Sequence, residues 1–300
     1  AMIATLFEVE DSMLIKISVL TFWTALFGTS VYKGLKAGIK ILADINVVLA
    51  IFAILFVLVA GPGVFILDLT VNSFGLMFSN FMSTATWTDP IREGDFPEAW
   101  TGFYWAWWFA YTGMVGLFFG RISRGRTIRQ LVLGVITWGC IGTWLFLAVM
   151  GGYSLFLEKT GALAVTEILN SQGMSFLNAL VIKSLPFGKI TLAIFTVLSI
   201  IFYATTIDSS AYVISSICAK DLENTQEPRR WNRITWAVLL ALITAGLLQA
   251  DSLQTTLSMT VVSSLPMIPI LILLCISIRK WLEEDFAHLN LNKEIVKTKC

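Results

Sequence analysis

Charge is what this sequence has least of. Asp, Glu, Lys and Arg make up 14% of its 300 residues, whereas hydrophobic residues make up 56%. Soluble domains carry roughly 25% charged residues, so this chain has too little polar surface to cover a water-soluble globule. The net charge of +1 also excludes a broad basic surface for nucleic acid. The composition predicts a protein of the lipid bilayer.

Residues that ligate metals or act as nucleophiles are also scarce. The four cysteines are Cys140, Cys218, Cys275 and Cys300, and they show no CxxC spacing. Three lie in or beside apolar runs, so we interpret them as small membrane hydrophobes. The single histidine, His288, lies in a polar tail. With no nucleophile–base pair, metal-ligand spacing or phosphate loop at membrane depth, we expect neither an enzyme nor a resident cofactor.

Long apolar runs take the place of the missing charge. Seven segments exceed or approach the roughly 18 residues of a membrane-spanning helix: 14–32, 45–67, 100–120, 131–153, 190–217, 234–250 and 254–278. A backbone in lipid must satisfy its own hydrogen bonds, and no alternating strand pattern is present, so the spans are predicted to be helices. The predicted fold class is an all-α polytopic membrane protein.

Two segments between the spans are too short or too polar to cross a bilayer. Residues 69–83 suit a helix that lies in the membrane interface. Residues 160–187 are predicted to form one or two short amphipathic helices that end at Pro186. No signal peptide is visible, because the apolar start lacks a basic flank, and we expect this start to lie inside a longer protein.

Basic residues predict the topology, because cytoplasmic loops are enriched in Lys and Arg. If the spans alternate, four basic clusters fall on one side: Lys33, Lys36 and Lys40; Arg121, Arg124, Arg126 and Arg129; Lys220, Arg229, Arg230 and Arg233; and Arg279 with Lys280. The other side carries Glu8, Glu10, Asp11, Asp89, Glu93, Asp95, Glu98 and Asp251. We therefore expect a multi-pass protein of the cell membrane with residue 1 outside and the C-terminus in the cytoplasm.

The third span carries a dense group of aromatic residues. Trp100, Tyr104, Trp107 and Tyr111 follow the spacing i, i+4, i+7, i+11, which places them on one face of a helix. An aromatic belt at the membrane surface accounts for Trp100 and Tyr104. It accounts less well for Trp107, Trp108 and Tyr111, which lie two to three turns deeper. Packing or a cage that holds a quaternary ammonium through cation–π attraction are both open interpretations of these rings.

The fifth span carries polar residues in the middle of an apolar helix: Thr205, Thr206, Asp208, Ser209 and Ser210, after Phe202. Such groups are costly in lipid. The hydroxyls can bond back to carbonyls one turn earlier, and the aspartate can pair with another helix. Alternatively, these oxygens are the hard ligands that a small cation such as sodium needs.

Particular sequence motifs resemble those of a known family. FYWAWW at 103–108 followed by RISRGRTIR at 121–129 is similar to the signature of the betaine/choline/carnitine transporter family. The approach WTDPIREGDFPEAWTGFYWAWW is similar as well, and ATTIDSSA at 204–211 resembles a TSADS-type motif in a later helix of that family. The resemblance runs from about Phe22 to about Lys280.

The resemblance implies a LeuT-type secondary transporter with twelve spans, which contain two inverted repeats of five. Residues 1–68 would then hold the last two spans of the first repeat, 69–99 an external interfacial helix and loop, 100–280 the second repeat, and 281–300 a cytoplasmic tail. About five preceding spans would be missing from this sequence. The resemblance also implies a homotrimer, with the Phe- and Met-rich 69–83 segment as a candidate contact.

Site residues follow from the resemblance position by position. Trp107, Trp108 and Tyr111 correspond to the family's aromatic substrate positions, and Trp100 to a tryptophan on the outer path. Met114 departs from the phenylalanine of betaine symporters.

For the ion site, Thr205 and Thr206 correspond to a Thr-Ser pair whose hydroxyls bind sodium together with a backbone carbonyl near Phe202. Asn46 stands where the carnitine exchanger of the family carries an arginine that replaces the ion.

The function implied is secondary active import of a small onium solute, such as betaine, choline, carnitine or a sulfonium analogue, with sodium as the coupling ion. Three alternatives stay open: a sodium-independent exchanger of the same fold, a proton-coupled symporter, and a sensor that does not transport.

The topology can be tested with single cysteines at Thr88 and Thr127. In intact cells a membrane-impermeant thiol reagent should label position 88 and spare position 127, because only the first is predicted to face outside. Both positions should react after permeabilisation. Equal labelling of both in intact cells would contradict the orientation.

Overall fold

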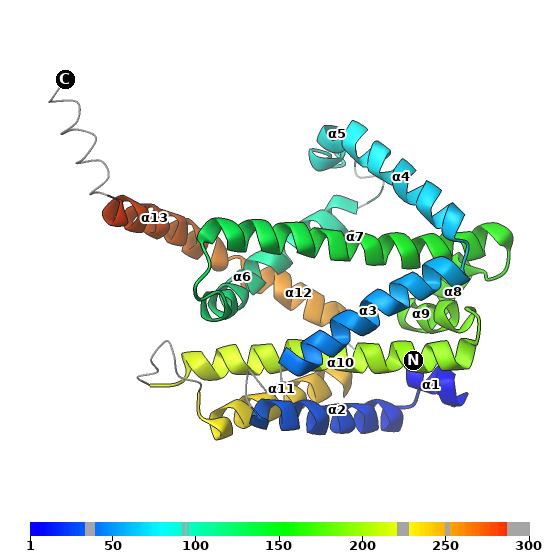
Figure 1. Ribbon diagram of the computed structural model, residues 1–300, viewed down its shortest axis with the longest axis horizontal. Helices are drawn as coiled ribbons and strands as arrows, with labels where there is room; N and C mark the ends of the chain where they lie inside the picture. The colour runs from blue at the N-terminus through cyan, green and yellow to red at the C-terminus, as the bar shows by residue number, and fades with distance from the viewer. Residues whose placement is uncertain (34–39, 92–93, 95, 221–227, 250–252, 287–300) are drawn as a thin grey trace. The chain divides into compact units, whose positions relative to one another are not determined.

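The structure is a computed structural model, and every regular element in its described part is helical (Figure 1). It describes residues 1–33, 40–91, 94, 96–220, 228–249 and 253–286, with backbone alone at 27, 29–33, 40, 249 and 253–256. The helices are α1 (Met2–Phe7), α2 (Met13–Lys33), α3 (Lys40–Ala60), α4 (Gly63–Ser79), α5 (Phe81–Ala85), α6 (Phe103–Ile122), α7 (Ile128–Thr160), α8 (Val165–Gln172), α9 (Met174–Lys183), α10 (Gly188–Ile217), α11 (Arg230–Gln249), α12 (Leu253–Ser264) and α13 (Met267–Asp285).

The chain divides into two compact units. The first comprises residues 1–86 and 117–249, and the second comprises residues 87–116 and 250–300. The boundary falls within α6, so its aromatic N-terminal part belongs to the second unit and its last residues belong to the first.

Several helices are long and apolar enough to cross a membrane. In the described residues these are α3, α7, α10 and α11, and the bent pair α12 and α13 makes a fifth if it forms one span. The other two predicted spans, 14–32 and 100–120, are also helical and correspond to α2 and α6. The described apolar part of α2 is Met13–Leu26, and α6 has 20 residues but is rich in Trp and Tyr, which hydropathy scales treat as polar. The count of seven spans stays a prediction.

The predicted span 45–67 is wrong at its C-terminal end. Helix α3 stops at Ala60 and α4 begins at Gly63. Pro62 lacks the N–H group that a continuing helix would need. A Cβ atom added to Gly61 would lie 2.6 Å from the Val57 carbonyl oxygen, so the turn requires glycine there. The helix predicted at 69–83 therefore starts earlier, and α4 and α5 divide it at Asn80.

The predicted span 254–278 is not one straight helix. Helices α12 and α13 meet at Leu265–Pro266 with a bend of 47°. Pro266 removes a helical hydrogen bond and its ring clashes with the preceding turn, which accounts for the break. Helix α13 also continues to Asp285, into the predicted tail. The rest of that tail, including His288 and Cys300, lies outside the described residues.

Helix α7 extends beyond its predicted range of 131–153 at both ends. At its start, the Thr127 hydroxyl accepts a hydrogen bond from the Gln130 backbone N–H at 3.2 Å, and Gln130 Oε1 accepts one from the Thr127 backbone N–H at 3.1 Å. This reciprocal capping box fixes where the helix begins. Gly161, with φ of 70°, ends it in the left-handed conformation that glycine tolerates.

Helix α10 is the centre of the first unit. It contacts α1, α2, α3, α9 and α11, and Figure 1 shows α2 and α11 lying alongside it. One core cluster joins Ala53 and Val57 of α3 to Leu192 and Phe195 of α10. A second forms where Ala204 and Ala211 of α10 meet Ala237 of α11. The small side chains in the second cluster let α10 and α11 approach closely.

The short helices predicted between 160 and Pro186 are confirmed as α8 and α9.

A cluster of charged side chains lies where α9 ends and α10 begins. The Glu8 carboxylate lies 3.1 Å from the Lys189 ammonium and 3.4 Å from the Lys183 ammonium. Hydrogen bonds from these two ammonium groups, that of Lys189 first, hold the pKa of Glu8 below its usual value. The cluster connects the segment after α1 to α9 and α10.

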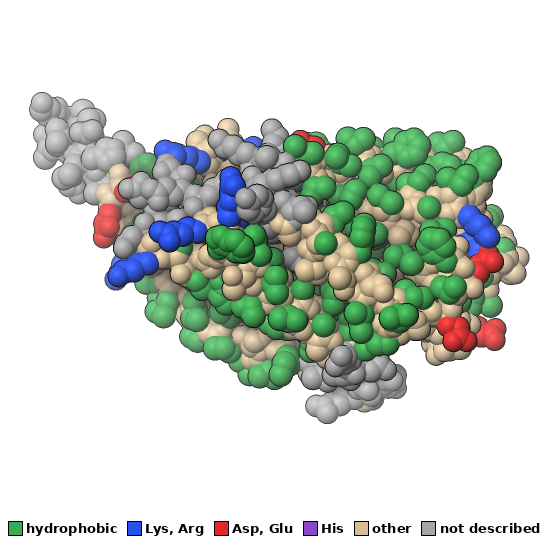
Figure 2. All heavy atoms as spheres, turned by 90° about the horizontal axis from the view of Figure 1, so that it is seen from below, with side chains coloured by type: hydrophobic (Ala, Val, Ile, Leu, Met, Phe, Trp, Pro, Cys, Tyr) green, Lys and Arg blue, Asp and Glu red, His purple; other side chains and the backbone are tan. Residues whose placement is uncertain are grey.

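The outer faces of the helices are apolar. Figure 2 shows hydrophobic side chains covering the middle of one face. Val59 is 83% exposed and Trp138 is 74% exposed. A soluble protein rarely exposes so continuous an apolar surface, whereas lipid requires one.

Helix α4 packs closely against α7 at Gly152. A Cβ atom at Gly152 would lie 3.4 Å from Ile66 Cγ1, whereas one at the adjacent Gly151 would meet nothing within 4 Å. Gly152→Leu should therefore destabilise the protein by about 1–3 kcal/mol, the usual effect of overpacking. Gly151→Leu is the matched control and should leave thermal stability in detergent unchanged. Equal melting of the two variants would contradict this packing.

Candidate functional site

The aromatic residues of the predicted cage lie in the second unit, on and just before α6. A π-helical segment, Pro97–Gly102, precedes the helix and contains Trp100. The helical spacing predicted from Trp100 onward therefore begins in a π turn, which winds more widely than an α turn. Trp100 and Tyr104 still share one face, because their rings stack with centroids 6.1 Å apart.

The aromatic residues of α6 contact one another and stay partly exposed. The Phe103 ring meets the Trp107 ring edge-on at 5.5 Å. Trp107 is 43% exposed and Trp108 is 62% exposed. At 100° per residue, Tyr104, Trp107, Trp108 and Tyr111 share an arc of about 100°. Trp105 lies outside this arc, where its ring packs on Phe109 at 5.7 Å.

The residues predicted to bind an ion lie in the first unit, on α10, and their oxygens are close together. The Thr205 hydroxyl donates to the Phe202 carbonyl at 2.7 Å, and the Thr206 hydroxyl donates to the same carbonyl at 3.2 Å. Both hydroxyl protons are therefore used within the helix, and both hydroxyl oxygens keep their lone pairs. This is the back-bonding expected of threonine in apolar helices, and it also fits the neutral, hard oxygen set that sodium accepts.

Asp208, one turn further along α10, is fully buried next to a cation. Its Oδ1 atom lies 3.9 Å from Nη2 of Arg233, which α11 contributes and which is 1% exposed. The Arg233 guanidinium also lies over the Tyr212 ring, 5.5 Å from its centroid. This geometry agrees with the interpretation that Asp208 pairs within the helix bundle.

Arg233 does not lie where the charge pattern predicts. That pattern places it in the basic loop 219–233, but the structure buries it in the first turn of α11. Its neighbours Arg229 and Arg230 are exposed, as predicted, and residues 221–227 lie outside the described part. The sequence feature that indicates a buried cation is Asp208, because a carboxylate inside an apolar helix requires a cationic partner.

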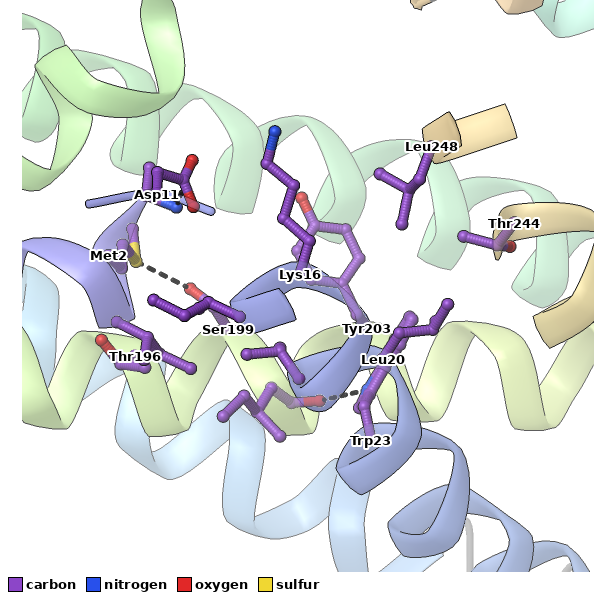
Figure 3. A pocket seen from close by; sticks show the side chains of 15 residues that line it. Met2, Asp11, Lys16, Leu20, Trp23, Thr196, Ser199, Tyr203, Thr244 and Leu248 are labelled. Carbon is purple, nitrogen blue, oxygen red and sulfur yellow. Dashed lines mark hydrogen bonds and ion pairs between the residues drawn. The ribbon is translucent and has the colours of Figure 1, made fainter. Parts of the chain in front are cut away.

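A cavity of about 340 Å³ opens between α1, α2, α10 and α11 (Figure 3). The Trp23 indole donates from Nε1 to the Ile200 carbonyl at 3.1 Å, and its ring meets the Tyr203 ring edge-on at 6.0 Å. The lining is mostly apolar, with the side chains of Asp11 and Lys16 as its two charged members. Because these carry opposite charges, the cavity shows no preference for a cation, and we do not assign it to substrate. No pattern in the sequence predicts this cavity.

Comparison with known proteins identifies the family. Residues 1–287 match the sequence model of the betaine/carnitine/choline family transporters. The chain belongs to this family. The resemblance carried by the α6 aromatics and the RISRGR loop is thereby confirmed.

Curated relatives of this chain in the betaine/carnitine/choline transporter (BCCT) family carry transporter names. The carnitine transporter of Acinetobacter baumannii is 32% identical over 280 residues, which is 93% of this chain and 51% of that protein. The high-affinity choline transport protein of Escherichia coli is 31% identical, over 97% of this chain and 43% of that protein. The glycine betaine transporter OpuD of Bacillus subtilis is 29% identical, over 93% of this chain and 54% of that protein.

Two statements follow from the family. The chain spans about half the length of the curated relatives it matches. Its several apolar helices of spanning length and its family indicate a multi-pass membrane protein. The predicted exclusion of an enzyme agrees with the names of these relatives.

The Asp208–Arg233 pair yields a stability prediction. Arg233→Ala should lower the melting temperature of the full-length protein in detergent, because it leaves a buried carboxylate uncompensated, at about 3–5 kcal/mol. Arg229→Ala, at an exposed position beside it, is the control and should have little effect. Adding Asp208→Ala to Arg233→Ala should restore part of the loss. Additive losses in the double variant would show that the two side chains act independently.

Proposed function

We propose that the full-length protein is a secondary transporter that imports a small quaternary-ammonium solute by sodium-coupled symport. The observation that carries this proposal is the arc of aromatic rings on α6 in a chain of the BCCT family. Trp107, Trp108 and Tyr111 are the proposed substrate-binding residues, and Trp100 is a proposed station on the outer path.

Cation–π attraction explains why such rings suit this solute. A quaternary ammonium has no N–H group to donate, so hydrogen-bond acceptors cannot recognise its charge specifically. The negative face of an aromatic ring attracts it, and tryptophan is the strongest partner. The exposure of Trp107 and Trp108 supports this role. A sulfonium analogue presents similar chemistry and belongs to the same substrate class.

The names of the relatives support the same class. Carnitine, choline and glycine betaine are the solutes in the names quoted above. These three molecules differ in their polar ends but share a trimethylammonium group. We therefore propose the trimethylammonium group, and not one particular solute, as what α6 recognises.

Sodium is the proposed coupling ion. Thr205, Thr206 and the Phe202 carbonyl together present three neutral oxygens on one turn of α10. Among the described residues no group of three or more His, Cys, Asp and Glu side chains is arranged to hold a metal ion. Neutral oxygens suit a weakly held monovalent cation better than a tightly bound divalent one. The pairing of Asp208 with Arg233 supports sodium over a proton carried by this carboxylate.

The architecture proposed for the whole protein follows the family. It has a LeuT-type fold with inverted repeats, seven of its spans in this chain, the C-terminus in the cytoplasm, and three copies in the assembly. In the 69–83 segment Phe74 packs on Trp144 of α7 at 5.2 Å, whereas Phe78, Phe81 and Met82 stay exposed. These exposed side chains support a contact with another copy.

Uptake of radiolabelled glycine betaine, choline and carnitine by the full-length protein tests the function. At least one should accumulate in sodium buffer and fall to background when potassium replaces sodium. Trp107→Ala should weaken binding of that solute by about tenfold, in the range of a desolvated cation–π contact. Trp105→Ala removes a ring outside the arc and is the matched control.

Each outcome separates the alternatives. Uptake that persists without sodium but needs a solute on the opposite side would indicate an exchanger. Uptake driven by a pH gradient alone would indicate proton coupling, and binding without uptake would indicate a sensor. A Trp107→Leu variant that binds as tightly as the parent would show that the ring only packs.

A further inference from the structure

Asn46 of α3 is a buried polar residue whose environment is incomplete. Its side chain is 9% exposed. Its amide oxygen Oδ1 is buried, and among the described residues it has no hydrogen-bond partner. Nearly all buried polar atoms in proteins are satisfied, so an unsatisfied one indicates that a partner such as an ion or water is needed.

Asn46 lies on the face of α3 that packs against α10. Ala53 is seven residues further along, which is two turns on the same face, and Ala50 is one turn along. Ala53 belongs to the core cluster together with Phe195 of α10. Ala53 and Phe56 also line a cavity of about 360 Å³ with Thr191 and Phe195. The stripe of α3 that contains Asn46 therefore continues the contact with α10.

The directions of the two helices set the level at which Asn46 meets α10. Figure 1 shows α3 and α10 running in opposite directions, and the two helices are in contact. Seven residues back from Ala53 reach Asn46, and seven residues forward from Phe195 reach Phe202. Both steps cover about 10.5 Å at 1.5 Å per residue. We infer that Asn46 stands near the level of Phe202, in the stretch of α10 that also carries Thr205 and Thr206.

The oxygens inferred to lie at this level are all acceptors. The hydroxyl protons of Thr205 and Thr206 already go to the Phe202 carbonyl. Asn46 Oδ1 can only accept. Oxygens with outward lone pairs repel one another unless a cation or a donor lies between them, and amide and hydroxyl oxygens are hard ligands of the kind that small cations prefer.

We propose that the Asn46 amide oxygen is a ligand of the coupling cation and completes, from α3, the oxygen set that α10 presents. The proposal rests on the sodium coupling proposed above. It makes the cation a bridge between two helices of the same unit. Because all these ligands are neutral, the site binds a monovalent cation without a fixed counter-charge, which allows the ion to leave again.

The test is equilibrium binding of ²²Na⁺ to the purified full-length protein, which does not depend on transport. Asn46→Leu removes the oxygen and should weaken sodium binding at least tenfold. Asn46→Asp keeps the shape and adds a negative charge, so it should tighten sodium binding several-fold. Leu49→Ala, three residues along the helix, removes packing but no ligand and should leave sodium affinity unchanged.

The outcomes are distinguishable. If the parent protein binds sodium and both Asn46 variants bind it equally well, Asn46 is not a ligand and the proposal fails alone. If the parent does not bind sodium and its solute uptake is independent of sodium, the proposed coupling fails and the proposal fails with it. If Asn46→Leu does not fold, the isosteric Asn46→Asp variant decides the question, and an unchanged sodium affinity in that variant overturns the proposal.

Discussion

Every polar group that α10 carries into the apolar interior has to find its partner on the same helix or on a neighbouring one. Lipid provides no water to satisfy such groups. The hydroxyls of Thr205 and Thr206 turn back to the Phe202 carbonyl, and Asp208 meets Arg233 from α11. This requirement constrains how α10 sits against α11, and α1, α2, α3 and α9 also pack against α10.

The same requirement separates two functions along one helix. At Asp208 a full charge is met by a full charge, which makes a permanent connection between α10 and α11. One turn earlier, α10 carries only the neutral oxygens of Thr205, Thr206 and Phe202, at which we propose that the coupling cation binds. Under this proposal, the charged contact persists and the neutral oxygens bind the ion reversibly. The aromatic arc on α6 follows a comparable principle, since cation–π attraction recognises a charge without a counter-ion.

The sequence predicted the elements that depend on local pattern. Apolar runs located the long helices, and the spacing around 160–186 located α8 and α9. Averaging over a run hid the breaks at Pro62 and Pro266, because one proline among apolar residues barely changes the average. The burial of Arg233 and the unsatisfied oxygen of Asn46 depend on which helices meet. Tertiary contact sets these features, so neither propensity nor charge counting could predict them.

The central claim is that α6 recognises the charge of a quaternary ammonium and not merely its shape. The direct measurement compares two ligands of the purified full-length protein by calorimetry. One is the trimethylammonium solute that the protein takes up, and the other is its analogue with a quaternary carbon in place of the nitrogen. Both have nearly the same volume, so packing alone would bind them equally. The account predicts that the charged solute binds at least tenfold more tightly, and equal affinity for the neutral analogue would contradict it.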